Sequence, residues 1–272
     1  MSARRQRQMC IRDSANTDFS YPGIGTDFSA SVVDYYSEAT TITDSTFSES
    51  QTEYDDVTVY NSGATTYEYI YYETAGTDIY SIYGGGLSIS GTSFTNGVQS
   101  LYLYETPTTI DSSTFSGYRQ VIASYGESLS LTHSALSDFT DEGVYCSQAE
   151  VEIEDTTFEN GGSESVNYDL YINGSLSSTG SSDYVAYGTR MYGCSARIQG
   201  ASFADLDGQA VYTSDYYEGD YELNTVSIEN VGQGTENHSA IYLYNYSSSY
   251  PTNVYMTSVS INTANTGSGL YA

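Results

Sequence analysis

Tyrosine has the clearest capacity for recognition in this sequence of 272 residues, which contains 31 tyrosines and no tryptophan. Several tyrosines directly follow an apolar residue. If each pair lies in a strand with its apolar residue inside, the tyrosine faces outward, where its ring can stack on sugars or form an adhesive surface. Tyrosine also favours strands and packs on cross-strand neighbours, so sheet packing is the alternative. The candidate binding residues are Tyr102, Tyr145, Tyr171, Tyr212 and Tyr242.

Residue types suited to acid–base catalysis are few in this chain. The two histidines are His133 and His238. His133 occupies a place that holds Asp44, Gly91 and Asp155 in similar stretches elsewhere, and such a set is typical of a turn. We therefore assign no catalytic residue.

Two acidic stretches have the composition of calcium-binding turns, Asp205-Leu-Asp207-Gly208 and residues 138–143. Calcium takes about six to eight oxygen ligands, which stacked turns can supply. The alternative is that both stretches are solvated turns without an ion. We assign no metal ligand and no cofactor, and calcium binding remains open.

The charge balance limits the possible partners. The chain has 35 acidic and 7 basic residues, with no lysine, for a formal charge of −28. Phosphate binding needs Lys and Arg, so nucleic acid is excluded as a partner, and anionic membranes are disfavoured for the same reason. No run of 18 apolar residues occurs, so membrane insertion is not expected. A neutral polysaccharide or cell-surface glycan fits this charge best.

The basic residues gather at the N-terminus. Residues 4–14, Arg-Arg-Gln-Arg-Gln-Met-Cys-Ile-Arg-Asp-Ser, resemble the translation of a sequencing-library adapter and carry four of the seven basic residues. We exclude residues 1–14 from the fold as an artefactual, disordered segment, and a basic arm that binds nucleic acid is the alternative. Without them the formal charge is 3 − 34 = −31.

A short pattern repeats eight times and predicts the elements that position these residues. Each copy has an apolar residue, four mostly small or polar residues and a second apolar residue. Ser or Thr precedes the second apolar residue in seven copies, and Asn, Asp or Gly follows it by two positions in six, as expected before turns. The pairs are Ile42/Phe47, Ile89/Phe94, Ile110/Phe115, Leu131/Leu136, Ile153/Phe158, Ile198/Phe203, Leu223/Ile228 and Met256/Ile261.

The spacing of the second apolar residue is 47, 21, 21, 22, 45, 25 and 33 residues. The common unit therefore has 21–25 residues. We interpret the intervals of 47 and 45 as two units each, and that of 33 as one unit with a longer loop. Such self-similarity indicates a solenoid, and apolar alternation at a spacing of two, as in Leu87-Ser-Ile89, indicates strands.

This pattern resembles the right-handed parallel β-helix proteins, also called pectate-lyase-like, over residues 40–272. The resemblance implies an all-β, right-handed parallel β-helix solenoid of roughly 9–11 coils, with coils stacked about 4.8 Å apart. The fold hosts lyases, hydrolases, adhesins and inert scaffolds. Pectate lyases use calcium-binding carboxylates with an Arg, and polygalacturonases use three Asp and a His. Neither set has a matching spacing here, so no site residue is carried over.

The two remaining cysteines, Cys146 and Cys194, lie 48 residues apart. If two coils separate them, their Cα atoms are about 10 Å apart, beyond disulfide reach. If residues 159–202 form one coil with a long loop, the two can meet. We favour unpaired cysteines, and the spacing carries no metal signature.

Residues 15–272 are predicted to form one parallel β-helix domain, with a degenerate first coil over residues 15–39. The chain ends within a repeat and without a polar cap, so we expect an internal fragment of a longer protein. We expect a secreted or cell-surface protein with a structural or adhesive role, carbohydrate contact and no enzymatic activity. The alternative is a polysaccharide-active enzyme, a lyase or a glycosidase. The oligomeric state is left open.

Overall fold

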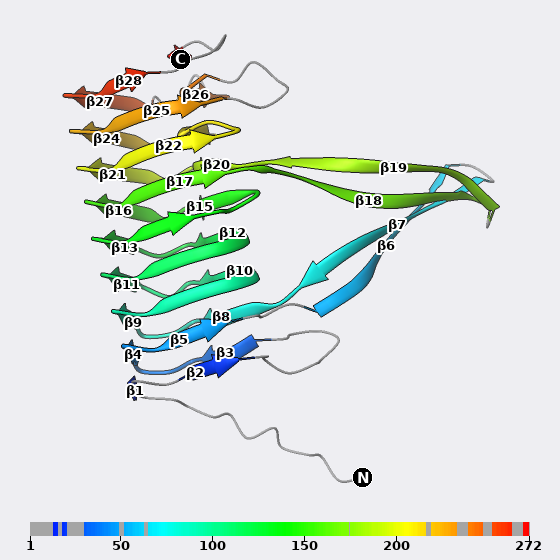
Figure 1. Cartoon of the computed structure of the whole chain (residues 1–272), viewed down its shortest axis with the longest axis horizontal. Coiled ribbons are helices and arrows are strands. Elements are labelled where there is room, and N and C mark those ends of the chain that lie inside the picture. The colour runs from blue at the N-terminus through cyan, green and yellow to red at the C-terminus, as the bar shows by residue number, and fades with distance from the viewer. Residues whose placement is uncertain are drawn as a thin grey trace.

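The chain folds into an all-β solenoid in which parallel strands stack coil upon coil (Figure 1). The computed structural model describes residues 13–15, 18–20, 30–48, 52–62, 65–173, 175–215, 219–232, 239–246, 252–262 and 269–271. One parallel sheet contains nine strands and runs the length of the stack, so the described residues form nine coils. The predicted fold class and the lower end of the predicted coil number are confirmed.

Each coil has three strand positions. The first position holds β1 (Asp13–Ala15), β4 (Thr40–Thr43), β9 (Leu87–Ser90), β11 (Thr108–Asp111), β13 (Leu129–Thr132), β16 (Glu150–Glu154), β21 (Ser195–Gln199), β24 (Asp220–Asn224) and β27 (Asn253–Thr257). The second holds β2 (Asp18–Ser20), β5 (Thr46–Ser48), β14 (Ala135–Ser137), β17 (Thr157–Gly161), β22 (Ser202–Leu206), β25 (Ser227–Val231) and β28 (Ser260–Asn262).

The third position forms the face that carries most of the predicted tyrosines. It holds β3 (Ala30–Tyr35), β8 (Thr77–Ile82), β15 (Glu142–Ser147), β20 (Tyr187–Tyr192), β23 (Val211–Asp215), β26 (Ile241–Asn245) and β29 (Leu270–Tyr271). In two coils the second and third positions merge into single long strands, β10 (Ser93–Tyr104) and β12 (Thr114–Tyr125).

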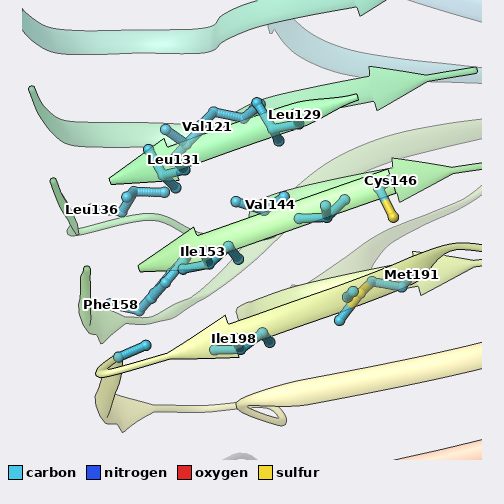
Figure 2. Close-up of a cluster of buried hydrophobic side chains, with 14 of the residues drawn as sticks. Val121, Leu129, Leu131, Leu136, Val144, Cys146, Ile153, Phe158, Met191 and Ile198 are labelled. Atoms are coloured by element: carbon cyan, nitrogen blue, oxygen red, sulfur yellow. The ribbon is translucent and has the colours of Figure 1, made fainter. Parts of the chain in front are cut away.

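Seven of the eight repeated apolar pairs form two buried ladders, while in the last pair Met256 is exposed and Ile261 is partly buried. Each second apolar residue lies beside its equivalent in the next coil, for example Phe47 beside Phe94 and Phe158 beside Phe203. The ladder of second apolar residues is fully buried at Phe47, Phe94, Phe115, Leu136, Phe158 and Phe203. Figure 2 shows Leu136 and Phe158 packed inside the coils with Leu131, Ile153 and Ile198 of the other ladder. Because each coil buries its apolar side only against its neighbours, these ladders hold the stack together.

Two columns of residues with left-handed backbone angles mark the corners after the first and second strand positions. The turn after the first strand position has φ between 45° and 58° at Asp44, Gly91, Ser112, His133 and Asp155. Near the end of the second position φ lies between 49° and 76° at Asn96, Gly117, Asp138, Asn160, Asp205 and Asn230, all of which except Asp138 lie within the bounds of their strands. Asn, Asp and Gly tolerate these angles best, so the predicted turn role of His133 is confirmed, and the Asn/Asp/Gly positions bend the chain at the second corner of the coil.

The intervals of 47 and 45 residues are single coils, so our interpretation of two units each was wrong. Phe47 pairs directly with Phe94, and Phe158 with Phe203. The extra residues form two antiparallel hairpins, which we call the arms: β6 (Thr52–Ser62) with β7 (Thr65–Ala75), and β18 (Ser163–Ile172) with β19 (Ser175–Val185). The 33-residue interval is one coil with a longer loop, as predicted.

The two arms leave the stack at different heights and converge at their far ends (Figure 1). There β7 pairs with β18, which joins the arms into one four-stranded sheet in the order β19-β18-β7-β6. At the junction the backbone N–H of Asn173 donates to the Thr66 carbonyl at 2.8 Å, and the Thr66 N–H donates to the Asn173 side chain at 2.9 Å.

The first coil consists of β1, β2 and β3, in the region predicted to hold a degenerate coil. Strand β1 begins at Asp13, two residues inside the adapter-like segment, and pairs with β4. Residues 1–12 lie outside the described residues.

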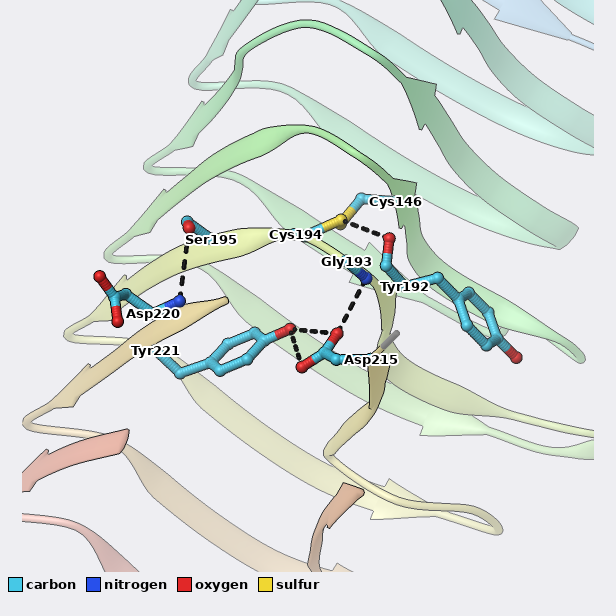
Figure 3. The surroundings of a disulfide bond; sticks show 8 residues. All are labelled: Cys146, Tyr192, Gly193, Cys194, Ser195, Asp215, Asp220 and Tyr221. Carbon is cyan, nitrogen blue, oxygen red and sulfur yellow. Dashed lines mark hydrogen bonds between the residues drawn. A yellow bond between two sulfur atoms is a disulfide. The ribbon is translucent and has the colours of Figure 1, made fainter. Parts of the chain in front are cut away.

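The two cysteines form a disulfide, so our preference for unpaired cysteines was wrong. Cys146 lies in β15 and Cys194 in the turn after β20, with Cα atoms 6.7 Å apart. The two cysteines lie on adjacent coils because the extra residues 163–185 form an arm. This is the alternative of one coil with a long insertion, in which the cysteines can meet. Beside the disulfide, the buried Asp215 accepts hydrogen bonds from the Gly193 N–H at 2.8 Å and from the Tyr221 hydroxyl at 3.0 Å (Figure 3).

Candidate functional site

Four of the five predicted tyrosines share one column on the outer face of the third strand position. Tyr102, Tyr145, Tyr212 and Tyr242 occupy equivalent places in β10, β15, β23 and β26. The column is interrupted by Ala123 in β12 and by Arg190 in β20. All four tyrosines are half-buried, because each lies against neighbouring rings while part of its surface remains open.

Tyr171 does not belong to this column, which corrects the prediction. It lies in β18 of an arm, where its register partners are Glu68 of β7 and Leu176 of β19. An apolar–Tyr pair fits an antiparallel hairpin as well as a solenoid strand, since both alternate residues between two faces.

A second column of tyrosines, which the sequence analysis missed, lies two residues further along the same strands. It contains Tyr104, Tyr125, Tyr192 and Tyr244. The signal was present in the doubled alternation Leu-Tyr-Leu-Tyr at residues 101–104 and Ile-Tyr-Leu-Tyr at residues 241–244. Together the two columns form what we call the tyrosine face.

The ring geometry differs along the tyrosine face. At its ends the rings stack face to face, with Tyr80 and Tyr102 centroids 4.8 Å apart at 12°, and Tyr212 and Tyr242 centroids 5.2 Å apart at 4°. Stacked rings cover one another's faces and leave mainly edges open.

In the centre the rings tilt. Tyr125 and Tyr145 have centroids 5.5 Å apart at 47°, and Tyr145 and Tyr192 have centroids 5.6 Å apart at 46°. Tilted rings leave part of each face uncovered, so the centre is the part of the tyrosine face best suited to stack on a ligand ring. Burial raises the pKa of Tyr125 to about 12, so this phenol stays neutral at physiological pH and can donate a hydrogen bond.

A ladder of polar side chains flanks the central rings. Gln99 donates to Gln120, and Gln120 donates to Glu142 at 2.9 Å. Arg190 Nη1 donates to the other carboxylate oxygen of Glu142 at 2.9 Å, and its Nε donates to the Tyr192 hydroxyl at 2.8 Å.

The Arg190 guanidinium also lies over three tyrosine rings. Its Cζ is 5.2 Å from the centroid of Tyr187, 5.4 Å from that of Tyr192 and 5.7 Å from that of Tyr212. These cation–π contacts add to the ion pair with Glu142. The guanidinium is therefore neutralised and held in place within the tyrosine face.

The carboxyl group of Asp141, next to Glu142, is protonated at this site. Burial, followed by the neighbouring charge of Glu142, raises the pKa of Asp141 to about 8, although Arg190 and Arg119 oppose the shift. The Asp141 carboxyl is therefore mostly protonated at neutral pH. With Glu142 balanced by Arg190 and Asp141 mostly protonated, these acids place no uncompensated negative charge at the centre of the tyrosine face.

A second group of charged residues lies on the outer face of the first strand position, in an open depression of about 560 Å³. Arg197 pairs there with Glu152 at 3.4 Å and with Glu222 at 3.6 Å, and the exposed Tyr255 also lines the depression. Two carboxylates and an arginine thus converge on one face. Because the guanidinium contacts both carboxylates, it occupies the place where a scissile glycosidic bond would have to lie between an acid and a base.

The remaining candidates take structural places. His133 Nδ1 lies 2.8 Å from Asp111, a hydrogen bond that raises the pKa of the exposed imidazole. Asp205 accepts from Asn230, and Asp207 from Ser163. Within the described residues, no group of three His, Cys, Asp or Glu is arranged to hold a metal ion. His238 lies outside the described residues.

Comparison with protein-family models, curated proteins and solved structures found no match. In the part of the chain that the structure describes, no helix is long and apolar enough to cross a membrane.

Proposed function

We propose that this chain belongs to a secreted or cell-surface β-helix protein with a structural or adhesive role, and that its tyrosine face binds a neutral polysaccharide. The observation that carries the proposal is the centre of that face. Tilted rings of Tyr125, Tyr145 and Tyr192 lie there beside a balanced ion pair of Glu142 with Arg190. Rings that stack on sugars, next to fixed hydrogen-bonding groups, are the features that carbohydrate recognition requires.

The electrostatics support a neutral ligand rather than a charged one. The chain's net charge of −28 repels polyanions. At the centre of the tyrosine face, however, the protonated Asp141 and the paired Glu142 leave no uncompensated negative charge. The disulfide between Cys146 and Cys194 supports an extracytoplasmic location, since disulfides persist in oxidising compartments.

The test is binding to immobilised neutral polysaccharides such as β-glucan and xylan, measured at low salt and at about 1 M salt, where exposed charges are screened beyond about 3 Å. We expect weak binding that persists at high salt, because ring stacking does not depend on charge. The pair Tyr145→Ala and Tyr212→Ala should reduce it.

Leu176→Ala provides the control, because Leu176 is exposed on an arm and belongs neither to the tyrosine face nor to the depression lined by Tyr255. Absence of binding to every neutral glycan, or a double variant that binds as well as its parent, would mean that the tyrosine face serves only as sheet packing.

A polysaccharide-active enzyme is the second candidate, and it rests on the depression that contains Glu152, Arg197 and Glu222. Catalysis there requires one carboxylate to leave Arg197 and act as acid or base when substrate binds. Release of new reducing ends from a polysaccharide, lost in Glu222→Gln and retained in Glu159→Gln, would support this candidate. Glu159 is an exposed acid of β17, at the second strand position, and does not line the depression.

A further inference from the structure

Two exposed tyrosines face each other across the first two coils, at one end of the tyrosine face. Tyr36 follows β3 and Tyr83 follows β8, and their rings are stacked with centroids 5.1 Å apart at an interplanar angle of 11°. Tyr36 is 64% exposed and Tyr83 is 38% exposed, so both phenols are accessible from solvent.

The backbone at both positions is unusual for bulky residues. Tyr36 has φ of 53° and Tyr83 has φ of 54°, in the left-handed region that aromatic side chains rarely adopt. The equivalent turns of later coils hold Glu105, Gly126 and Gln148. The left-handed angle is therefore set by this corner of the coil, and the first two coils differ from these three later coils in carrying an aromatic ring there.

Hydrogen bonds fix the two turns in register. The Tyr36 N–H donates to the Ile82 carbonyl at 3.1 Å, and the Tyr83 N–H donates to the Tyr104 carbonyl at 2.9 Å. The two rings are therefore held side by side by the solenoid rather than brought together by chance encounter.

The pair also continues into the tyrosine face. Tyr83 lies 5.4 Å from Tyr104 between ring centroids, and Tyr104 lies 6.3 Å from Tyr125, which contacts Tyr145. Neighbouring phenols at such distances exchange an electron readily. Oxidation of a half-buried tyrosine can therefore move from ring to ring to the exposed pair, where water accepts the phenol proton.

We propose that Tyr36 and Tyr83 form an oxidative cross-linking site, at which a carbon–carbon bond between the two rings staples the first coil to the second. The oxidant is hydrogen peroxide, used by a haem peroxidase. The site is independent of any glycan binding, because it needs only the two phenols and their fixed spacing.

The reaction balances without a further reactant. Each phenol loses one electron and one proton to give a phenoxyl radical, whose unpaired electron is shared with the ring carbons next to the hydroxyl-bearing carbon. Two such carbons, one from each ring, form the new bond. Each then loses its hydrogen as a proton while the phenol oxygen regains one. Peroxide takes up the two electrons and two protons and leaves as two molecules of water.

The test treats the dilute full chain with hydrogen peroxide and a haem peroxidase, followed by a protease that cleaves after acidic residues. Cleavage after Asp34, Glu38, Asp78 and Glu105 places Tyr36 in peptide 35–38 and Tyr83 in peptide 79–105. We expect these two peptides to be recovered linked, with a mass two hydrogen atoms below their sum, together with dityrosine fluorescence from monomeric protein.

Tyr36→Phe and Tyr83→Phe keep a stacking ring but lack the phenol, and each should abolish the linked peptide. Tyr255→Phe is the matched control, because Tyr255 is 63% exposed, nearly as much as Tyr36, and lies outside the tyrosine face. It should leave the link unchanged. Recovery of unlinked peptides, links to Tyr255 as often as between Tyr36 and Tyr83, or covalent dimers as the main product would overturn the proposal.

Discussion

Replacing Phe158 by alanine tests whether the buried ladder holds the coils together. The Phe158 side chain is fully buried, and its ring stacks on Phe203 of the next coil with centroids 4.7 Å apart at 15°. On the other side it lies in register with Leu136. Gly143 touches the ring edge so closely that a Cβ there would lie 2.9 Å from Phe158 Cδ1. The ring therefore packs between the coils on both sides, so its removal leaves a cavity between them.

The expected loss in the free energy of unfolding follows from these contacts. Removing a buried phenyl ring forfeits about 2–3 kcal/mol of apolar transfer free energy, and loss of the stacked pair adds about 0.5–1.5 kcal/mol. A residual cavity raises the cost further. We therefore expect Phe158→Ala to lower the free energy of unfolding by about 3–5 kcal/mol.

Equilibrium urea unfolding followed by far-UV circular dichroism measures this loss, because the chain has no tryptophan to report on packing. Phe158→Leu, which refills part of the space, should cost less than the alanine variant. Tyr255→Ala, at an exposed site, should change the free energy by no more than about 0.5 kcal/mol. A loss below about 1 kcal/mol for Phe158→Ala would show that the buried ladder contributes little to the free energy of unfolding.

Three further predictions concern the disulfide, a buried acid and the N-terminus. Changing Cys146 and Cys194 to serine should lower the free energy of unfolding by about 4 kcal/mol, because the disulfide closes a loop of 48 residues in the unfolded chain; urea unfolding with and without a reductant measures it. Asp141 has a pKa raised to about 8 in the folded chain against about 3.9 when unfolded, so its contribution to stability is lost as pH rises between these values. Asp141→Asn should flatten the fall in the thermal midpoint over that range. Removing residues 1–12 should leave the thermal midpoint unchanged, because they precede β1.

Each of these predictions has a contradicting result. Equal stability of the oxidised and reduced protein would show that the disulfide does not constrain the unfolded chain. Glu127→Gln removes one exposed negative charge and should keep the parent's dependence of the thermal midpoint on pH. If this dependence became flatter in both variants, the titration of Asp141 would not be its cause. A clear drop in midpoint after the N-terminal deletion would mean that the adapter-like segment supports the first coil.

The ladders were predictable because equivalent positions of successive coils require the same residue types, which therefore recur in the sequence at the length of one coil. Each Phe of the ladder is preceded by Ser or Thr, and each except Phe47 is followed two residues later by Asn, Asp or Gly, so one copy predicts the next. The arms were not predictable in this way. Strand β7 has Tyr67, Tyr69 and Tyr71 at a spacing of two, and β18 has Val166, Tyr168 and Leu170 at the same spacing. The coils show the same alternation, which does not distinguish parallel from antiparallel pairing.

The centre of the tyrosine face was hidden for a related reason. Glu142 and Arg190 lie 48 residues apart, and their contact depends on the register of two coils between which an arm is inserted. Without the position of the arm, Arg190 could not be aligned with Tyr145. The same uncertainty misplaced Tyr171 and made the disulfide look improbable.

The pairing of β7 with β18 makes the middle of this solenoid behave unlike its ends. In a simple solenoid each coil depends only on its neighbours, so unravelling that starts at one end can proceed coil by coil. Here the arms belong to the coils of β4 and β16, and the strand order places β9, β11 and β13 between them. When the chain is pulled or digested from either end, unravelling reaches a coil whose arm is paired with the other arm. The three coils between the arms are then released only after β7 and β18 separate.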